Sequence, residues 1–378
     1  MTEVAERNVS RRRFLKSGTI AAGAAAGALA MPSVVTAQSP IVIKMQSSWP
    51  ASDIFHEMAG QYVTRVEAMS AGRIKIDLTP AGAIVGAFQV LDAVNDGVID
   101  ASHTVPVYWY GKHKAASFFG TGPVFGGSAA TMLGWFYQGG GKELYAELTQ
   151  QILGLDVYGF FAFPMPAQPF GWFKNPVTSA DDVKGLKYRT VGLAADLMQE
   201  MGMSVAQLPG GEIVPAMEKG VIDAFEFNNP TSDMRFGSQD VAKNYMLSSY
   251  HQASEAFEFL FNKDFFDGLD PDLQAILQYG VEAASSANHF FALNQYSTDL
   301  QTLQTQHGVS VLRTPQSVLD AELAAWDKLI AQLEQDAFMK KIMDSQRAWV
   351  ERVVFYEIMN SPDYTLAYQH YFPGKLKL

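Results

Sequence analysis

The sequence predicts an α/β fold of two similarly built lobes with a cleft between them, followed by long C-terminal helices. Strand and helix patterns alternate from residue 41 to about residue 229, which is typical of mostly parallel sheets with helices on their faces. The pentapeptide Gly-Val-Ile-Asp-Ala occurs twice, at residues 97–101 and 220–224. A repeated helix–Gly–strand unit favours two lobes over one continuous core, and clefts between lobes are where small ligands bind.

The first 37 residues have the features of an export signal. Residues 10–16, Ser-Arg-Arg-Arg-Phe-Leu-Lys, form a twin-arginine pattern, and residues 17–30 are a weakly apolar run of Ala and Gly. This run is too short for a bilayer, which needs roughly 20 residues. Val35-Thr36-Ala37 fits cleavage before Gln38, with residues 28–30 as a poorer alternative. We expect residues 1–37 to be a cleaved twin-arginine signal peptide and the mature protein to be periplasmic.

The composition of the mature chain limits its partners. Removing residues 1–37 from the 378-residue chain leaves 341 residues, a length that favours two domains. The mature part keeps 23 of the 28 Lys and Arg and 37 of the 39 Asp and Glu, so the net charge falls from −11 to −14. Nucleic acid and anionic membranes favour basic surfaces, so neither is expected as a partner. There is no cysteine, and the fold must be stabilised by packing rather than by disulfides.

The elements of the first lobe follow the leader in order. Ser52 is the expected N-cap of a helix that runs to about Met69. Gly97 is expected to end a later helix, because a residue without Cβ enters the left-handed conformation freely. Val-Ile of the first pentapeptide should then begin a buried strand. Strands are expected at residues 41–45, 73–78 and 98–104, and helices at 52–69 and 87–95.

The second lobe repeats this order after a loop rich in Gly and Pro at residues 120–127. A Pro-rich turn at residues 164–169 joins two of its strands. Strands are expected at residues 156–163, 170–174 and 186–189, and helices at 128–137, 142–152, 193–201 and 212–219.

The last third of the chain is mainly helical. A long helix is expected from Pro271 to about Thr305, and Pro315 opens a further helical pattern that continues to about Met359. Apolar residues cover more than one face of this pattern, so it either packs on the chain's own lobes or reaches over a partner subunit. We divide the chain into residues 1–37 (signal), 38–160 (mostly lobe I), 161–265 (mostly lobe II) and 266–378 (hinge-spanning and C-terminal helices).

The search for catalytic motifs argues against an enzyme. No Gly-x-Ser-x-Gly nucleophile motif occurs, and without cysteine there is no thiol nucleophile. The seven histidines include no pair at i, i+4, so the helical zinc motif is absent from the sequence. Residues 139–142, Gly-Gly-Gly-Lys, are followed by Glu143, where a phosphate loop needs Ser or Thr.

The chain resembles the solute-binding proteins of TRAP-type transporters, the extracytoplasmic receptors of tripartite ATP-independent periplasmic transporters. The resemblance covers nearly all of the mature chain. It is carried by the twin-arginine leader, both pentapeptides, residues 80–82 (Pro-Ala-Gly) and residues 183–189 (Val-Lys-Gly-Leu-Lys-Tyr-Arg). Its most specific stretch, residues 186–228, is similar to the branch that binds 2-oxo acids. The resemblance implies a two-lobed periplasmic-binding-protein-like fold.

Arg189 is the principal candidate for ligand binding. It stands at the end of a predicted strand, which is the expected site for a ligand in an α/β lobe. The resemblance implies that it binds the ligand carboxylate. A guanidinium suits this role, because its planar fork can form two parallel hydrogen bonds to a carboxylate.

The resemblance also implies a cation, Na⁺ or Ca²⁺, bound between protein and ligand. The matching positions are Gln168 in the Pro-rich turn, Glu226 after the second pentapeptide, and the main-chain carbonyl of Phe227, where the family more often has Trp. Amide, carboxylate and carbonyl oxygens are donors that both ions prefer. Asn228 and Asn229 are further polar candidates for ligand binding.

Two aromatic residues are expected to form the facing wall of the cleft. Trp49 follows the first strand, and Tyr108 follows the strand after the first pentapeptide. Their N–H and O–H groups could hold a small acid. Either residue could equally pack beneath a loop.

Together these features predict a receptor that binds a small 2-oxo monocarboxylate, pyruvate or a longer acid, with a metal cation and delivers it to membrane subunits. The alternatives are a receptor for a 2-hydroxy acid such as lactate or another carboxylate, a sensor with the same pocket, and a metal-dependent oxo-acid lyase or hydratase. The 2-oxo-acid branch also implies a homodimer, for which residues 315–359 could supply the dimerisation helix. The sequence does not decide between Na⁺ and Ca²⁺ or give the length of the ligand.

Overall fold

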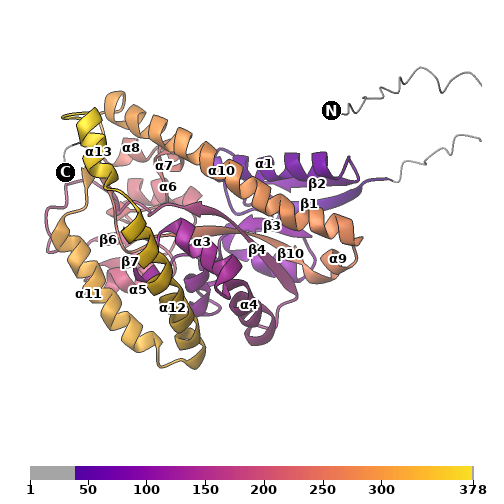
Figure 1. Ribbon diagram of the computed structural model, residues 1–378. Helices are drawn as coiled ribbons and strands as arrows, with labels where there is room; N and C mark the ends of the chain where they lie inside the picture. The colour runs from indigo at the N-terminus through magenta and orange to yellow at the C-terminus, as the bar shows by residue number, and fades with distance from the viewer. Residues whose placement is uncertain (1–38, 377–378) are drawn as a thin grey trace, which may run out of the picture. The chain divides into compact units, whose positions relative to one another are not determined.

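The computed structural model describes residues 39–376 (Figure 1). The predicted signal peptide and its cleavage site lie outside the described residues. Residues from Pro40 onward form one compact unit. Within the described part, every helix is too short or too polar to cross a membrane.

The first sheet, with the helices on it, forms lobe I. Its strand order is β2-β1-β3-β10-β4. β1 is parallel to β2 and β3, whereas β10 is antiparallel to β3 and β4. The strands are β1 (Ile41–Ser47), β2 (Ile74–Thr79), β3 (Ala101–Thr104), β4 (Val157–Met165) and β10 (Glu255–Asn262). β10 therefore belongs to lobe I, although residues 161–265 were expected to lie mostly in lobe II.

The second sheet forms lobe II, in the order β11-β9-β5-β8-β6-β7. Here β5 is antiparallel to β8 and β9, and the other neighbours are parallel. The strands are β5 (Gly171–Phe173), β6 (Lys187–Arg189), β7 (Ser204–Ala206), β8 (Ala224–Phe225), β9 (Asn244–Leu247) and β11 (Ser310–Arg313). Both sheets are mixed, not mostly parallel as expected. The antiparallel strands are β5, which follows β4 of lobe I, and β10, which follows β9 of lobe II. Each therefore enters its sheet directly from a strand of the other lobe.

The two pentapeptides have matching conformations. Gly97 and Gly220 have φ angles of 68° and 69°, and end the helices α2 (Val90–Asn95) and α6 (Ile213–Glu218) as predicted. The Ile of each copy is fully buried, but Val98 and Val221 are 52% and 54% exposed. The strand begins only at the Ala that closes each copy, so the prediction that Val-Ile starts the strand was wrong.

The Asp of each pentapeptide holds the neighbouring parallel strand. The Asp100 N–H donates to the Lys44 carbonyl at 2.9 Å, and the Asp100 carboxylate accepts from the Lys44 N–H at 2.8 Å. Asp223 makes the same pair of bonds with Lys187, at 2.7 and 3.2 Å. The repeat thus builds the same helix-to-strand corner in both lobes.

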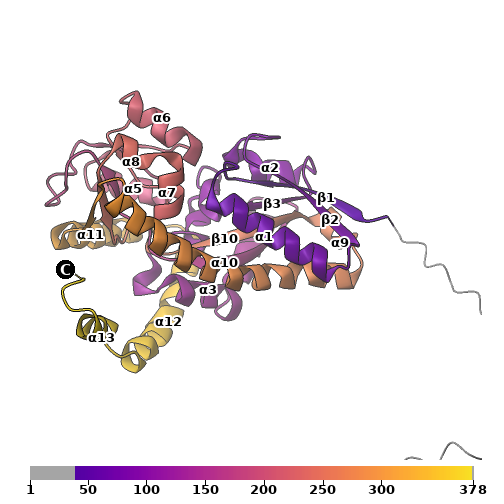
Figure 2. The same ribbon diagram turned by 90° about the horizontal axis from the view of Figure 1, so that it is seen from above.

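Helices cover both sheets, and two sets of helices join the lobes. The long α10 contacts α1 and β4 in lobe I and α7 in lobe II, and Figures 1 and 2 show it lying along both. α11 packs on α5 of lobe II, whereas α12 packs on α3 of lobe I. The remaining helix bounds are α1 (Ile54–Met69), α3 (Ala129–Gln138), α4 (Gly141–Ala146), α5 (Leu193–Glu200), α7 (Pro230–Phe236), α8 (Ser238–Val241), α9 (Lys263–Asp267), α10 (Pro271–Thr305), α11 (Gln316–Leu333), α12 (Ala337–Asn360) and α13 (Tyr364–Tyr371), with a π-helical turn at Glu147–Ile152 after α4.

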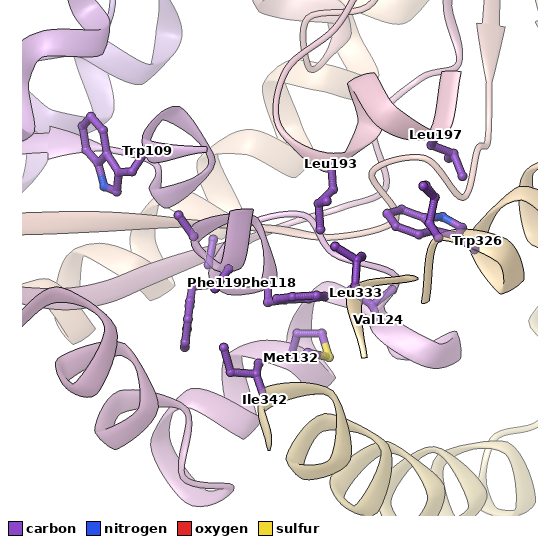
Figure 3. Packing of buried hydrophobic residues seen from close by; sticks show 14 of the residues in the cluster. Trp109, Phe118, Phe119, Val124, Met132, Leu193, Leu197, Trp326, Leu333 and Ile342 are labelled. Carbon is purple, nitrogen blue, oxygen red and sulfur yellow. The ribbon is translucent and has the colours of Figure 1, made fainter. Parts of the chain in front are cut away.

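Two helix boundaries differ from the prediction. The N-cap of α1 is Asp53 rather than Ser52, because Asp53 Oδ1 accepts the Phe55 N–H at 3.1 Å. The expected continuous pattern at residues 315–359 is two helices, since the chain turns at residues 334–336 and Asp336 caps α12. Figure 3 shows that α5, α11 and α12 contribute to one apolar core, through Leu193, Leu197, Trp326, Leu333 and Ile342.

Candidate functional site

The candidate ligand site is a small pocket between the two lobes. Its free space is about 10 Å³, enough for about one water molecule, so the lobes are closed on each other. The chain crosses between the lobes at residues 166–170 and 248–254, beside the pocket. The pocket is lined by Trp49, Phe55, Val105 and Tyr108 of lobe I, by Arg189, Val191, Phe227 and Asn228 of lobe II, and by Gln168 and Glu255 at the crossings.

Arg189 ends β6 with its side chain only 1% exposed. Its Nε and Nη2 donate to the Leu208 carbonyl at 2.9 and 2.7 Å. Its Nη1 donates to the main-chain oxygen of Glu226 at 2.8 Å and to Glu226 Oε1 at 3.1 Å. These acceptors fix the plane of the guanidinium and leave the second N–H of Nη2 as a donor for a ligand.

Glu226 follows β8 and is fully buried behind the pocket wall. Its Oε1 forms the ion pair with Arg189, but its Oε2 has no hydrogen-bond partner among residues 39–376. Burial raises the pKa of Glu226 to about 7, although the charge of Arg189 lowers it. A buried carboxylate oxygen without a donor is unfavourable unless a proton or a cation neutralises it.

Gln168 and Glu255 connect the two crossing segments. Gln168 Nε2 donates to Glu255 Oε2 at 2.5 Å, and the Gln168 backbone N–H donates to the Gln252 carbonyl at 3.0 Å. Gln168 Oε1 is a further buried oxygen without a partner in the described chain. Burial, and then the charge of Glu226, raise the pKa of Glu255 to about 8.

These oxygens fit a hard cation. Gln168, Glu226 and Glu255 supply one amide and two carboxyl groups around a pocket whose one cationic side chain is Arg189. Oxygen donors of this kind suit Na⁺ and Ca²⁺. No three His, Cys, Asp or Glu residues of the described ranges form a metal cluster by themselves. A cation at this place would therefore need amide or carbonyl oxygens, or oxygens of the ligand, to complete its coordination.

The two asparagines have different roles. Asn228 lines the pocket, donating from Nδ2 to Glu255 Oε2 at 3.1 Å. Asn229 does not line it, because its Oδ1 caps α7 by accepting the backbone N–H groups of Thr231 and Ser232 at 3.0 and 2.9 Å. Only Asn228 can reach a ligand from this closed arrangement.

The aromatic candidates supply mainly apolar surface. The indole N–H of Trp49 donates to His103 Nδ1 at 2.8 Å, so only its ring faces the pocket. Tyr108 is partly buried at the wall, and its hydroxyl makes no hydrogen bond to another described residue. The Phe227 ring lies 5.6 Å from the Arg189 guanidinium. A Cβ on Gly210 would approach this ring to 2.6 Å, so glycine is needed beneath it.

The pocket residues that the sequence did not predict are Phe55, Val105, Val191 and Glu255. Glu255 opens a strand that is otherwise almost wholly apolar and buried. A carboxylate in such a strand is a signal that could have been used, because unpaired acids are almost never buried. Phe55 lies two residues after the N-cap Asp53, in the first turn of α1.

Hydrogen bonds and close backbone contacts hold the lobes together around the pocket. Gly192, with φ 65°, lies so close to lobe I that a Cβ there would be 2.1 Å from Val107 Cγ2. Further contacts include Leu193 N–H to Ser117 Oγ (3.1 Å), Tyr110 OH and Lys114 Nζ to the Asp196 carboxylate (both 2.8 Å), and Ser232 Oγ to Asp53 Oδ1 (2.8 Å). Burial raises the pKa of Asp53 to about 6.

Comparison with known families identifies the chain. Residues 45–341 match the family model described as bacterial extracellular solute-binding protein, family 7, or DctP. The protein belongs to this family. A relative described as a monocarboxylate 2-oxoacid-binding periplasmic protein, from Nostoc sp. strain PCC 7120, is 31% identical over 325 residues, which are 85% of this chain and 87% of the relative. The predicted resemblance to TRAP solute receptors is confirmed.

Solved structures agree with this assignment. The DctP-family chain superposes on a TRAP periplasmic solute-binding protein from Pseudoalteromonas atlantica T6c with bound sodium and pyruvate, with a TM-score of 0.80 and 28% identity over 88% of this chain and 99% of that one. It matches a TRAP solute-binding protein from Bordetella bronchiseptica RB50 equally well (TM-score 0.80, 25% identity, 88% and 97% covered), a mixed-occupancy dimer with copurified calcium and picolinate. The two-lobed fold is confirmed, and family members are extracytoplasmic solute receptors.

Proposed function

We propose that this DctP-family receptor binds a small 2-oxo monocarboxylate together with Na⁺ or Ca²⁺ in the pocket between its lobes. The observation that carries the proposal is the meeting of one buried arginine with two buried carboxyl groups and two partnerless oxygens, Glu226 Oε2 and Gln168 Oε1. An anion alone would leave those oxygens unsatisfied. An anion bound together with a cation pairs with both kinds of group, the anion with Arg189 and the cation with the buried oxygens.

Each polar residue has a defined task in this proposal. Arg189 donates its remaining N–H to the ligand carboxylate. Gln168 Oε1, the Glu226 and Glu255 carboxylates and the main-chain carbonyl of Phe227 hold the cation. The cation, when bound, draws together the carboxylate and keto oxygens of a 2-oxo acid. Similar ligand and cation pairs, sodium with pyruvate and calcium with picolinate, occur in the structures named above.

The apolar side of the pocket favours a monocarboxylate. Lobe I contributes Trp49, Phe55, Val105 and the partly buried Tyr108, and no cation. A second carboxylate on the ligand would face this surface or the buried acids, without a partner for its charge. A short apolar group on the ligand would instead be buried favourably against these rings.

The experiment is a thermal-shift titration of the mature chain, residues 38–378. Pyruvate, 4-methyl-2-oxopentanoate, lactate and succinate are each added with Na⁺, with Ca²⁺ and with a chelator in Na⁺-free buffer. A ligand that binds only the folded state stabilises it by mass action and so raises Tm. At a free ligand concentration of 100 times Kd, the free energy of unfolding rises by about 2.7 kcal/mol. We expect a rise with the 2-oxo acids that disappears when both cations are removed.

The matched variant is Glu226→Gln, which keeps the size of the side chain and removes its charge. We expect weaker ligand binding and a lost dependence on cation concentration. A rise in Tm with lactate or succinate alone would show that the ligand is a 2-hydroxy acid or a dicarboxylate and not a 2-oxo monocarboxylate. Undiminished cation dependence in Glu226→Gln would remove Glu226 from the cation site.

The receptor role also suggests functions for the leader and for the movement of the lobes. Residues 1–37 would direct export by the twin-arginine route, and the receptor would work in the periplasm. Lobe closure around the ligand, about the crossings at residues 166–170 and 248–254, would create the surface recognised by the membrane subunits of a TRAP transporter. The moving parts in this proposal are the two lobes defined by the sheets, so β4 and β10 move with lobe I rather than dividing from it at about residue 160, and the helices from residue 266 join the lobes. The pocket binds and releases its ligand without chemical change.

A homodimer is proposed from the exposed C-terminal helices. α13 buries none of its residues. Large apolar side chains exposed on α12 and α13 are Phe355 (68%), Ile358 (70%), Met359 (71%), Leu366 (66%) and Tyr371 (73%). An exposed apolar patch of this kind marks a protein interface. The interface therefore extends beyond the expected residues 315–359 into α13, and one similar structure is a dimer.

The dimer is tested by the mass in solution. The mature chain is expected to run at twice its own mass in light scattering, and Phe355→Glu/Ile358→Glu at the monomer mass with an unchanged circular dichroism spectrum. Both side chains are exposed in the single chain, so their replacement should not disturb its fold. A monomeric parent protein would refute the dimer.

A further inference from the structure

One segment of lobe I both lines the pocket and contacts lobe II at several points. We call residues 105–117 the cleft rim. It contains η2 (Pro106–Trp109), and η3 (Lys114–Phe119) begins within it. Two of its residues line the ligand pocket and four meet lobe II: Val105 and Tyr108, and Val107, Tyr110, Lys114 and Ser117.

The cleft rim has one buried polar attachment to the sheet behind it. Trp109 is 1% exposed, and its indole Nε1 donates to Glu258 Oε1 at 2.8 Å. Glu258 lies in the middle of β10 with no exposed surface, and its Oε2 accepts the hydroxyl of Tyr145 in α4 at 2.6 Å. Trp109 belongs to the same apolar cluster as Phe118 and Phe119 of η3.

The packing around Glu258 leaves space for its carboxyl group. Gly159 of β4 pairs with Leu260 of β10, and a Cβ on Gly159 would lie 2.6 Å from Tyr145 Cε1 and 2.9 Å from Glu258 Oε2. No ion pair to Glu258 is formed within residues 39–376. Burial raises the pKa of Glu258 to about 7, against the two hydrogen bonds that lower it. Burying a carboxyl group without an ion pair lowers the stability of the fold, so Glu258 is expected to have a role other than apolar packing.

We propose that Glu258 is a positioning residue for ligand binding, which holds the cleft rim through Trp109 so that Tyr108 and Val105 face the pocket and Val107 meets Gly192. The ligand part of this inference rests on the proposed function. The same strand begins with Glu255, which holds Gln168 and Asn228. β10 thus positions both walls of the pocket, one through Glu255 and the other through Glu258.

The test compares four variants. Glu258→Leu removes both hydrogen-bond acceptors, and Trp109→Phe removes only the attachment of the rim. Glu258→Gln is the conservative rescue, because its amide can accept from Trp109 and donate to the Tyr145 oxygen. Tyr137→Phe is the matched control, since it deletes another hydroxyl hydrogen bond of lobe I, to the carbonyl of Phe161, and leaves both hydrogen bonds of Glu258 intact.

Two measurements are made on each variant. Calorimetry gives Kd for pyruvate with Na⁺ and with Ca²⁺, well below the Tm of each protein. Hydrogen exchange of the ligand-free protein, read by mass spectrometry, gives the protection of residues 105–117. We expect Kd to rise at least about tenfold in Glu258→Leu and Trp109→Phe, and to change less than about threefold in Glu258→Gln and Tyr137→Phe. Exchange should be faster in the rim of the first two only.

The outcomes separate positioning from simple stabilisation. A lower Tm with unchanged Kd and unchanged rim exchange in Trp109→Phe would overturn the proposal, as would equal effects in Tyr137→Phe. If Glu258→Leu does not fold, Trp109→Phe carries the same comparison. If the parent protein binds no pyruvate with either cation, the proposed function fails, whereas the exchange of residues 105–117 still decides whether Glu258 holds the rim.

Discussion

Arg189→Lys is expected to weaken ligand binding at least about a hundredfold while the protein stays folded, because Lys keeps the charge but cannot reproduce the planar fork. The guanidinium holds the Leu208 carbonyl, the Glu226 main chain and the Glu226 carboxylate at once, and presents its last N–H to the pocket. A lysine ammonium can satisfy only part of this set and would be drawn towards Glu226. Calorimetry with pyruvate and Na⁺ or Ca²⁺ measures the loss.

The matched control lies on the same strand. Lys187 is exposed and reaches only the Gly220 carbonyl and Asp223, so Lys187→Ala should leave Kd unchanged. Arg189→Ala should abolish binding altogether, but it also leaves a buried carboxylate unpaired, at a cost of about 3–5 kcal/mol in stability. Arg189→Lys is therefore the cleaner variant. Tight binding by folded Arg189→Lys would show that the ligand is held elsewhere.

Arg189 could be predicted because its position depends on local signals. A short strand, the pentapeptide that follows and the family resemblance all place it at a strand end, and β6 ends at Arg189 in the structure. The glycines of the two pentapeptides were predictable for the same reason, since a positive φ at a helix end is a property of a few neighbouring residues.

Glu255 could not be placed in the same way. It enters the pocket because the chain leaves lobe II after β9, and β10 then pairs with β3 and β4, whose residues are about 90–160 positions earlier in the chain. Such long-range pairing leaves no local pattern. The hydrogen bond from Trp49 to His103 is a similar case, because it joins β3 to the turn after β1 and removes the indole N–H from the ligand site.

The N-cap of α1 was also not predictable from local sequence. Ser52 and Asp53 are both good N-caps, and the sequence alone does not rank them. The structure selects Asp53, whose Oδ1 also accepts from Ser232 of lobe II. A contact between lobes thus decides a local boundary.

Gly192→Ala is expected to prevent full closure of the lobes and to weaken ligand binding about 10- to 100-fold, which corresponds to about 1.4–2.8 kcal/mol. Gly192 has φ 65° and ψ −147°, a conformation that residues with a side chain rarely adopt. An added Cβ would also lie 2.1 Å from Val107 Cγ2 and 2.8 Å from Ser117 Oγ of the cleft rim. Opening the lobes relieves both contacts, so the variant should favour the open, unliganded form.

The measurements are Kd by calorimetry and the radius of gyration by X-ray scattering at saturating ligand. Gly111→Ala is the matched control, because it also adds a Cβ to the rim but finds no atom within 4 Å. Val107→Ala introduced into Gly192→Ala removes the closest contact and should recover part of the affinity. If Gly192→Ala binds and compacts like the parent protein, the contact between Gly192 and the rim is not part of the bound state, and the ligand must be held by the lobes in a more open arrangement.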